Sequence, residues 1–155
     1  MARECVFVDE WDVEAPILAV FRALCDATTY PLWWTPVYLS VDADGPLRAG
    51  RVARERFRGR LSRELSAQSE IVRLEPPREF EVSVVGDVSG HRTCTLSKPS
   101  DRLVHVRFEF RVVLGAAQRP VSRWKHRWWI APAIERLEPY ARASASVPVS
   151  AASST

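Results

Sequence analysis

Residues 104–114 read VHVRFEFRVVL, with hydrophobic side chains at every even position and mainly polar side chains between them. Because successive side chains of a β-strand point to opposite faces of a sheet, this alternation predicts a strand with one buried and one solvated face. A sheet with one apolar face needs a covering layer, and residues 118–140, which follow, are long enough for a helix of several turns. The segment therefore predicts an antiparallel sheet with a C-terminal helix lying on it.

The residues before this strand show the same pattern of strands and turns. Clusters of Gly, Pro, Asp and Ser, such as residues 44–46 and 75–77, recur about a strand length apart, as in hairpin-linked antiparallel sheets. The six strands predicted in this part of the chain are residues 37–41, 51–59, 65–74, 80–86, 91–97 and 102–114. A strand over residues 5–13, also alternating, brings the total to seven.

Two short helices are predicted between the first strand and the second. Apolar residues recur at spacings of three and four from Ile17 to Leu24, as on one face of an amphipathic helix. Asp26 can cap a second helical piece over residues 27–34, which Pro36 keeps short.

The length and composition fit one folded domain. The chain has 155 residues, of which 46% are hydrophobic and 26% charged, so neither a disordered nor a fibrous chain is indicated. We expect the domain to span residues 1–142, with a flexible, Ala/Ser-rich tail over residues 143–155.

Composition also bears on compartment and partners. The formal net charge of +3 is too small to indicate a nucleic-acid partner. No run of about 18 apolar residues is present to span a membrane. Acidic residues interrupt the N-terminal region where an export signal needs an apolar run, and the three cysteines form no CxxC pair. We therefore expect a cytoplasmic protein, and its oligomeric state is left open.

The order of the elements resembles the helix-grip fold of the START-like (SRPBCC) superfamily. The segments that carry the resemblance are VEAPILAVFRALCDATTYPLWW (13–34), IVRLEPPREFE (71–81), GDVSG (86–90), VRFEFRV (106–112) and RWKHRWW (123–129). The chain is most similar to the polyketide cyclase/dehydrase group of that superfamily, up to about residue 140.

This resemblance implies an α+β fold. A seven-stranded, curved antiparallel sheet would surround a long C-terminal helix, with two short helices after the first strand. The resemblance also implies a deep cavity between the sheet and the long helix, holding an apolar small molecule. It does not fix a reaction, because the same scaffold serves cyclases, dehydratases and lipid carriers.

Glu55 is the first candidate for chemistry in such a cavity. Arginines occupy positions 54, 56, 58 and 60 of the predicted strand and must face water, which turns Glu55 and Phe57 inward. Burial in an apolar cavity raises the pKa of a carboxyl group, so an inward glutamate could act as a general acid or base. The alternative is an ordinary ion-paired glutamate near the cavity rim.

Arg92 is the second candidate. Leu96 indicates that the side of strand 91–97 carrying Arg92 and Cys94 faces inward. Proteins of the resembling group often have Gly and an aromatic residue at these two places, so this chain adds a cation and removes bulk. A guanidinium could stabilise an enolate or phenolate oxygen, although Arg92 could instead reach water or pair with Glu55. Cys94 lacks an evident neighbouring base and fits a small core residue.

Aromatic residues supply the expected cavity wall. We expect Trp33 and Trp34 at the cavity entrance, and Trp124 and Trp128 of the last helix facing the cavity. An alternative face through Ile130, Ile134 and Leu137 would turn Arg123, His126 and Arg127 inward, and Pro132 would permit a change of face. The full predicted set of ligand-binding residues is Trp33, Trp34, Phe57, Val84, Cys94, Phe108, Phe110, Trp124 and Trp128.

Two functions remain in competition. The leading hypothesis is an enzyme that binds an apolar, oxygen-bearing, polyketide-like molecule and promotes its cyclisation or dehydration, with Glu55 and Arg92 as catalytic residues and neither metal nor other cofactor. The alternative is a non-catalytic carrier or sensor of a lipid-like ligand. An interaction module with a filled cavity is a third hypothesis. We interpret the basic and aromatic stretch 123–129 as a solvated helix face rather than a nucleic-acid or membrane surface.

Overall fold

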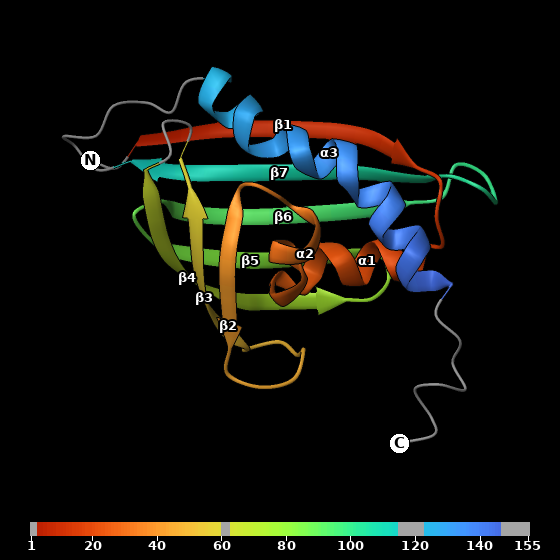
Figure 1. Ribbon diagram of the computed structural model, residues 1–155, viewed down its shortest axis with the longest axis horizontal. Helices are drawn as coiled ribbons and strands as arrows, with labels where there is room; N and C mark the ends of the chain where they lie inside the picture. The colour runs from red at the N-terminus through yellow and green to blue at the C-terminus, as the bar shows by residue number, and fades with distance from the viewer. Residues whose placement is uncertain (1–2, 60–62, 115–122, 147–155) are drawn as a thin grey trace.

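A curved antiparallel sheet of seven strands forms most of the computed structural model, which describes residues 3–59, 63–114 and 123–146 (Figure 1). The strands are β1 (Arg3–Val13), β2 (Tyr38–Ala43), β3 (Val52–Arg58), β4 (Glu64–Glu75), β5 (Glu79–Gly86), β6 (Ser89–Ser97) and β7 (Val104–Leu114). Their order across the sheet is β1-β7-β6-β5-β4-β3-β2, which leaves β1 and β2 at the edges. The seven strands predicted from the sequence are thus confirmed.

The helices all lie on one face of the sheet (Figure 1). They are α1 (Ile17–Cys25), the short 3-10 turn η1 (Ala27–Thr29), α2 (Tyr30–Trp33) and the long α3 (Arg123–Ala145). Asp26 caps η1 as predicted, because its carboxylate accepts a hydrogen bond from the backbone N–H of Thr28 at 3.2 Å. Helix α3 packs against α1, α2 and β1, and so it closes one side of the layered structure.

The alternation of inward and outward side chains along each strand, here called strand parity, places the predicted inward residues of the sheet correctly. In β3 the arginines at positions 54, 56 and 58 are exposed, while Glu55 and Phe57 between them are buried. Every even position of β7 is buried, as its alternation predicts. In β6 the same rule turns Arg92 and Cys94 inward.

Helix α3 presents a different face from the one predicted. Its buried residues are His126, Ile130, Ala133, Leu137 and Ala141. Trp124, expected inward, is 58% exposed, because it lies two residues before His126 and so on nearly the opposite side of the helix. The alternative face is correct for Ile130, Leu137 and His126, and wrong for Ile134, Arg123 and Arg127, which are exposed.

The extent of α3 also differs from the prediction. The helix continues through Pro132 to Ala145, so residues 143–145 belong to its last turn and not to a flexible tail. Residues 147–155 of the predicted tail and residues 118–122 of the predicted helix lie outside the described residues.

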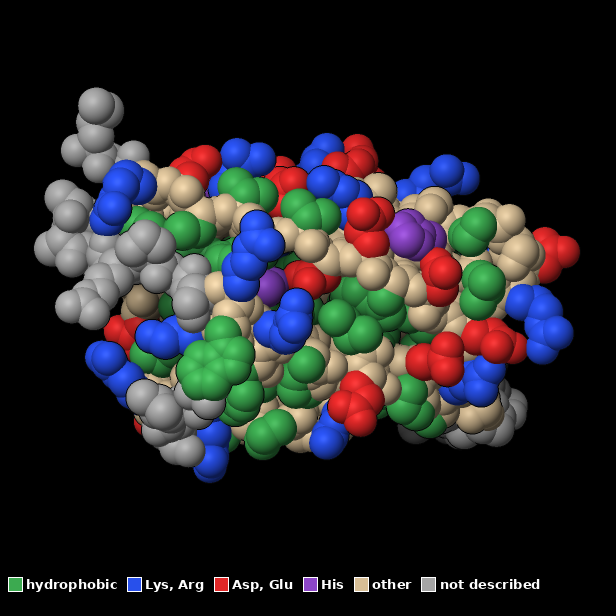
Figure 2. Space-filling model, turned by 90° about the horizontal axis from the view of Figure 1, so that it is seen from above, with side chains coloured by type: hydrophobic (Ala, Val, Ile, Leu, Met, Phe, Trp, Pro, Cys, Tyr) green, Lys and Arg blue, Asp and Glu red, His purple; other side chains and the backbone are tan. Residues whose placement is uncertain are grey.

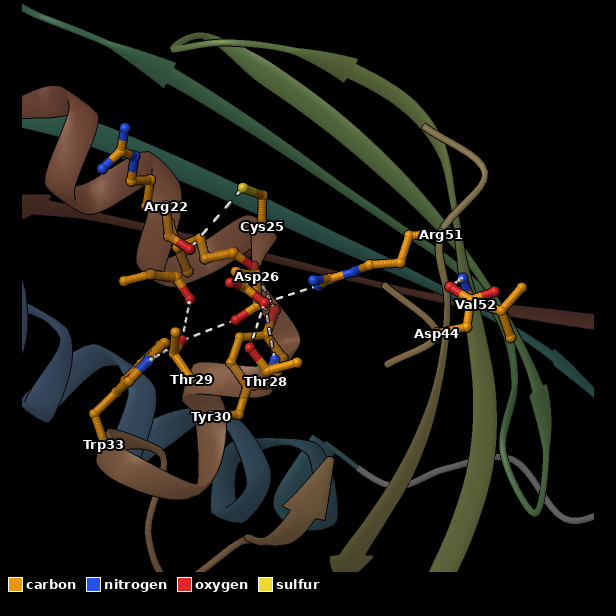
Figure 3. A network of polar contacts seen from close by, with 12 residues as sticks. Arg22, Cys25, Asp26, Thr28, Thr29, Tyr30, Trp33, Asp44, Arg51 and Val52 are labelled. Atoms are coloured by element: carbon orange, nitrogen blue, oxygen red, sulfur yellow. Dashed lines mark hydrogen bonds and ion pairs between the residues drawn. The ribbon is translucent and has the colours of Figure 1, made fainter. Parts of the chain in front are cut away.

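A buried ion pair joins the helical segment to the sheet (Figure 3). Arg51, the residue before β3, donates from Nη2 to Oδ1 of Asp26 at 2.8 Å and is almost fully buried. Burial alone would raise the pKa of Asp26, but hydrogen bonds from Thr28 and Arg51 outweigh it and leave that pKa below its ordinary value. The pair fixes the start of β3 against the end of α1.

The β6–β7 pairing depends on Gly90. A Cβ atom at this position would lie 2.0 Å from the carbonyl oxygen of Arg111 in β7, and the backbone φ is +157°. We expect Gly90→Ala to lower the free energy of unfolding by about 1–3 kcal/mol, measured by urea denaturation.

Gly59→Ala is the matched control, because the nearest atoms to its added Cβ lie at 3.5 Å, an ordinary contact. It should change the free energy of unfolding by less than about 0.5 kcal/mol. Equal effects of the two substitutions would contradict the close approach of β6 and β7.

Candidate functional site

A cavity of about 180 Å³ lies between the inner face of the sheet and α3. Its wall is mainly apolar, and the Phe, Tyr and Trp residues in it are Phe7, Tyr38, Phe57, Phe110, Trp128 and Trp129. Valine and leucine side chains from β4, β5 and β7 complete much of the rest. The expected hollow between sheet and long helix is therefore present.

Three polar side chains from three strands meet on the wall of this cavity. Arg92 of β6 donates from Nη2 to both carboxylate oxygens of Glu55 of β3, at 3.0 and 2.8 Å. Its Nη1 lies 3.4 Å from the hydroxyl of Tyr38, the first residue of β2. Glu55 is 1% exposed and Arg92 3% exposed. Because β4 and β5 separate β3 from β6, it is the curvature of the sheet that brings this pair together.

The electrostatics of this cluster keep it charge-neutral overall. Burial lowers the pKa of Arg92, but the Glu55 carboxylate beside it more than compensates and holds that pKa above its ordinary value. Burial raises the pKa of Tyr38, with the Arg92 charge opposing the shift, so the hydroxyl stays protonated and can donate. Arg92 Nε has no hydrogen-bond partner within the described part of the chain. The cluster thus offers both donors and acceptors without net charge.

Six predicted site residues line the cavity. They are Glu55, Phe57, Val84, Arg92, Phe110 and Trp128. Their inward orientation follows from strand parity in the sheet and from the last helix packing across it. Whether they bind a ligand or act in catalysis stays a prediction.

The other predicted wall residues lie elsewhere. Trp33 and Trp34 are buried in an aromatic cluster rather than at a cavity entrance, and the Trp34 indole N–H donates to the carbonyl of Trp129 at 2.7 Å. Phe108 packs against Trp34 and is fully buried in the core. The exposed Trp124 does not line the cavity.

Cys94 is also a core residue. It is fully buried, and its β-sheet partners are Phe80 of β5 and Phe108 of β7. Burial raises the pKa of its thiol well above the ordinary value, which keeps the group uncharged. This agrees with its interpretation as a small core residue and removes it from the cavity wall.

Sequence reasoning missed several wall residues. Tyr38 lay inside a predicted strand but was not considered, although parity with the next strand could have found it. Phe7 lay inside the predicted first strand, but no face of that strand was assigned to the cavity. His126 was considered only as part of the alternative helix face. Trp129 was not considered, because its neighbour Trp128 had been assigned to the cavity.

Other kinds of site have little support in the described residues. Within residues 3–59, 63–114 and 123–146, no group of three or more His, Cys, Asp and Glu side chains is placed to hold a metal ion. None of the helices in this part of the chain has the length and apolar character needed to cross a bilayer.

Comparison with known proteins supports the fold. Neither a protein-family model nor a curated protein sequence matches the chain. Among solved structures, the Zhui aromatase/cyclase from Streptomyces sp. R1128 superposes with a TM-score of 0.73 at 13% identity, covering 90% of this chain and 94% of that one.

Two plant proteins are similarly close. The major latex-like protein 151 of Panax ginseng has a TM-score of 0.71 at 11% identity, covering 88% of this chain and 97% of that one. A Thalictrum norcoclaurine synthase has a TM-score of 0.69 at 10% identity, covering 94% and 99%. At these identities the similarity shows a shared fold, and it confirms the helix-grip fold that the sequence predicts.

The Glu55–Arg92 pair should be strongly coupled. Removing either partner leaves a buried charge without compensation, so Glu55→Gln or Arg92→Met should each lower the free energy of unfolding by about 3–5 kcal/mol. The double variant should lose clearly less than the sum of the two single losses. Urea denaturation of all four proteins measures the coupling.

The exposed pair Arg56–Glu64 is the matched control, because it joins the same residue types on the outer face of β3 and β4. Arg56→Met should cost no more than about 1 kcal/mol. Additive losses at Glu55 and Arg92 would contradict a tightly coupled pair.

Proposed function

We propose that the chain binds a small, neutral, apolar molecule carrying at least one oxygen, with that oxygen at the Tyr38–Glu55–Arg92 cluster. The observation that carries this proposal is a charge-compensated polar cluster in a mainly aromatic and aliphatic cavity. Ligand sites typically combine an apolar wall with a few convergent polar groups that fix orientation.

A buried ion pair is weak evidence for a stabilising role. Burying two charges costs solvation energy, and hydrophobic side chains of similar volume often serve a core equally well or better. A buried Glu–Arg pair on a cavity wall is therefore better explained by recognition than by stability. Tyr38 and Arg92 supply donors, and Glu55 supplies an acceptor.

Charge decides which oxygen-bearing ligand fits. Because Glu55 already compensates Arg92, a ligand carboxylate at this cluster would add a negative charge that Arg92 no longer balances. A phenol, alcohol or carbonyl group adds none. We therefore favour a neutral hydroxyl or carbonyl compound over a fatty acid.

The cavity volume limits the size of the ligand. About 180 Å³ is smaller than the roughly 300–1,000 Å³ typical of drug-sized ligand sites. A ring-sized molecule fits this space better than a long polyketide chain does.

Proton-transfer catalysis, in the form of cyclisation or dehydration, is the second candidate function. Two of the similar structures are named as an aromatase/cyclase and a synthase. The donors of Tyr38 and Arg92 could stabilise a developing enolate oxygen, as electrostatic catalysis requires. However, both oxygens of Glu55 already accept from Arg92, so the acid–base role expected of Glu55 is less well supported than a role in binding.

Naphthol is a suitable probe for the cavity, because it combines fused aromatic rings with one hydroxyl. We expect Trp128→Ala, which removes an aromatic wall, to raise the dissociation constant of naphthol about tenfold, measured by titration calorimetry. Trp124→Ala, which removes an exposed tryptophan of the same helix, should leave it unchanged. Equal losses in both variants, or no binding by the native chain, would refute the assigned cavity.

The polar cluster makes a separate prediction. The native chain should bind naphthol more tightly than naphthalene or naphthoate, the first lacking the oxygen and the second carrying a charge. Tyr38→Phe should reduce the preference for naphthol over naphthalene by about two- to tenfold, since one hydrogen bond is lost. An unchanged preference in this variant would place the ligand oxygen away from Tyr38.

A further inference from the structure

His126 connects two hollows of the molecule. Its side chain, on the buried face of α3, lines the internal cavity and also an outer groove between β1 and α3. The residue is 8% exposed, and its ring stacks on Phe7 with centroids 4.1 Å apart and planes 7° apart. The ring therefore has a fixed orientation in the wall that separates the cavity from the groove.

Asp9 of β1 holds this ring from the outer side. The distance between His126 Nε2 and Asp9 Oδ2 is 2.6 Å. In a neutral imidazole with Nε2–H donated to a carboxylate, Nδ1 carries the lone pair and can accept a proton. The carboxylate then stabilises the imidazolium that forms, which is the role of the acid in nucleophile–base–acid triads.

Few other groups on the cavity wall can accept a proton. Of the described residues there, Arg58, Arg92 and Lys125 are cationic donors, and Tyr38 is kept protonated by burial. Glu55 is committed through both oxygens to Arg92. His126, by contrast, is a weak base whose ring contacts the Asp9 carboxylate.

We propose that His126 is the general base of this cavity and that Asp9 is its positioning residue. This rests on the proposed function, because the substrate is a carbonyl compound whose oxygen lies at Tyr38 and Arg92. His126 takes a proton from the carbon next to the carbonyl. The C–H electron pair forms the enolate double bond, and the carbonyl π electrons move to the oxygen, where both donors stabilise the charge. The enolate carbon can then attack a second carbonyl of the same molecule and close a ring: the first carbonyl re-forms, and the oxygen of the second takes the proton back from the His126 imidazolium.

Asp9 lies on the outer side of this wall. Its side chain is 22% exposed and lines the outer groove, which Arg123 and Arg127 of α3 also line. Figure 2 looks onto the edge formed by β1 and α3, where basic side chains gather beside hydrophobic ones. The carboxylate that orients His126 thus lies on the solvent side of the cavity wall.

Nitrobenzisoxazole tests for such a base without knowledge of the natural substrate. A base removes its ring C–H proton, the freed electron pair completes a nitrile, and the N–O bond breaks to give a coloured phenolate, with no other reactant. We expect the native chain to accelerate this reaction and His126→Gln to lower kcat at least a hundredfold with little change in KM. Added imidazole should restore part of the rate in His126→Ala.

His105→Gln is the matched control. His105 of β7 also contacts a β1 carboxylate, Asp12 at 2.8 Å, but it lies on the outer face of the sheet. Its substitution should leave kcat unchanged. Asp9→Asn leaves the stacked ring in place and should lower kcat about tenfold without rescue by imidazole, which distinguishes a positioning role from a loss of folding.

Naphthol titration separates the two proposals. Absence of naphthol binding by the native chain would refute the proposed function. Intact naphthol binding together with an unchanged kcat in His126→Gln, or in Asp9→Asn if the former does not fold, would overturn the role of His126 alone. A native chain that binds the probe without accelerating its reaction would overturn it as well.

Discussion

The curvature of the sheet determines what the rest of the molecule can do. A seven-stranded antiparallel sheet with one apolar face has to be covered, and the covering layer consists of α3 and the short helical segment after β1. Straight helices on a concave surface cannot fill it completely, so a hollow lined by aromatic side chains remains. The same curvature brings β3 close enough to β6 for Glu55 and Arg92 to pair across two intervening strands.

Local patterns predicted most of this fold because its strands are one-sided. The alternation in residues 104–114 and the arginine series around Glu55 each set a face without reference to the remainder of the chain. Strand parity could not separate the cavity wall from the solid core, because both lie on the same inward face. Phe108 and Phe110 illustrate this, since only the packing of Trp34 decides that the first is in the core.

The face of α3 was harder to predict for a related reason. Trp124 and Trp128 compete with the aliphatic stripe of Ile130, Ile134 and Leu137, so the helix has apolar residues on several sides. Tertiary packing against α1 and β1 selects the face through Ile130 and Leu137. That selection turns His126 inward and brings its ring against the Asp9 carboxylate. The spacing of apolar residues along the helix could not predict this contact, because it depends on a strand from the other end of the chain.

The Arg51–Asp26 pair bears on how a molecule could reach the interior. Moving α1 and α2 away from the sheet would expose or break this buried ion pair and the neighbouring packing of Tyr30 and Trp34. That side of the curved sheet is therefore held closed by the helices packed on it. A molecule would then enter at the opposite end, where the exposed residues Arg58 and Lys125 border the hollow.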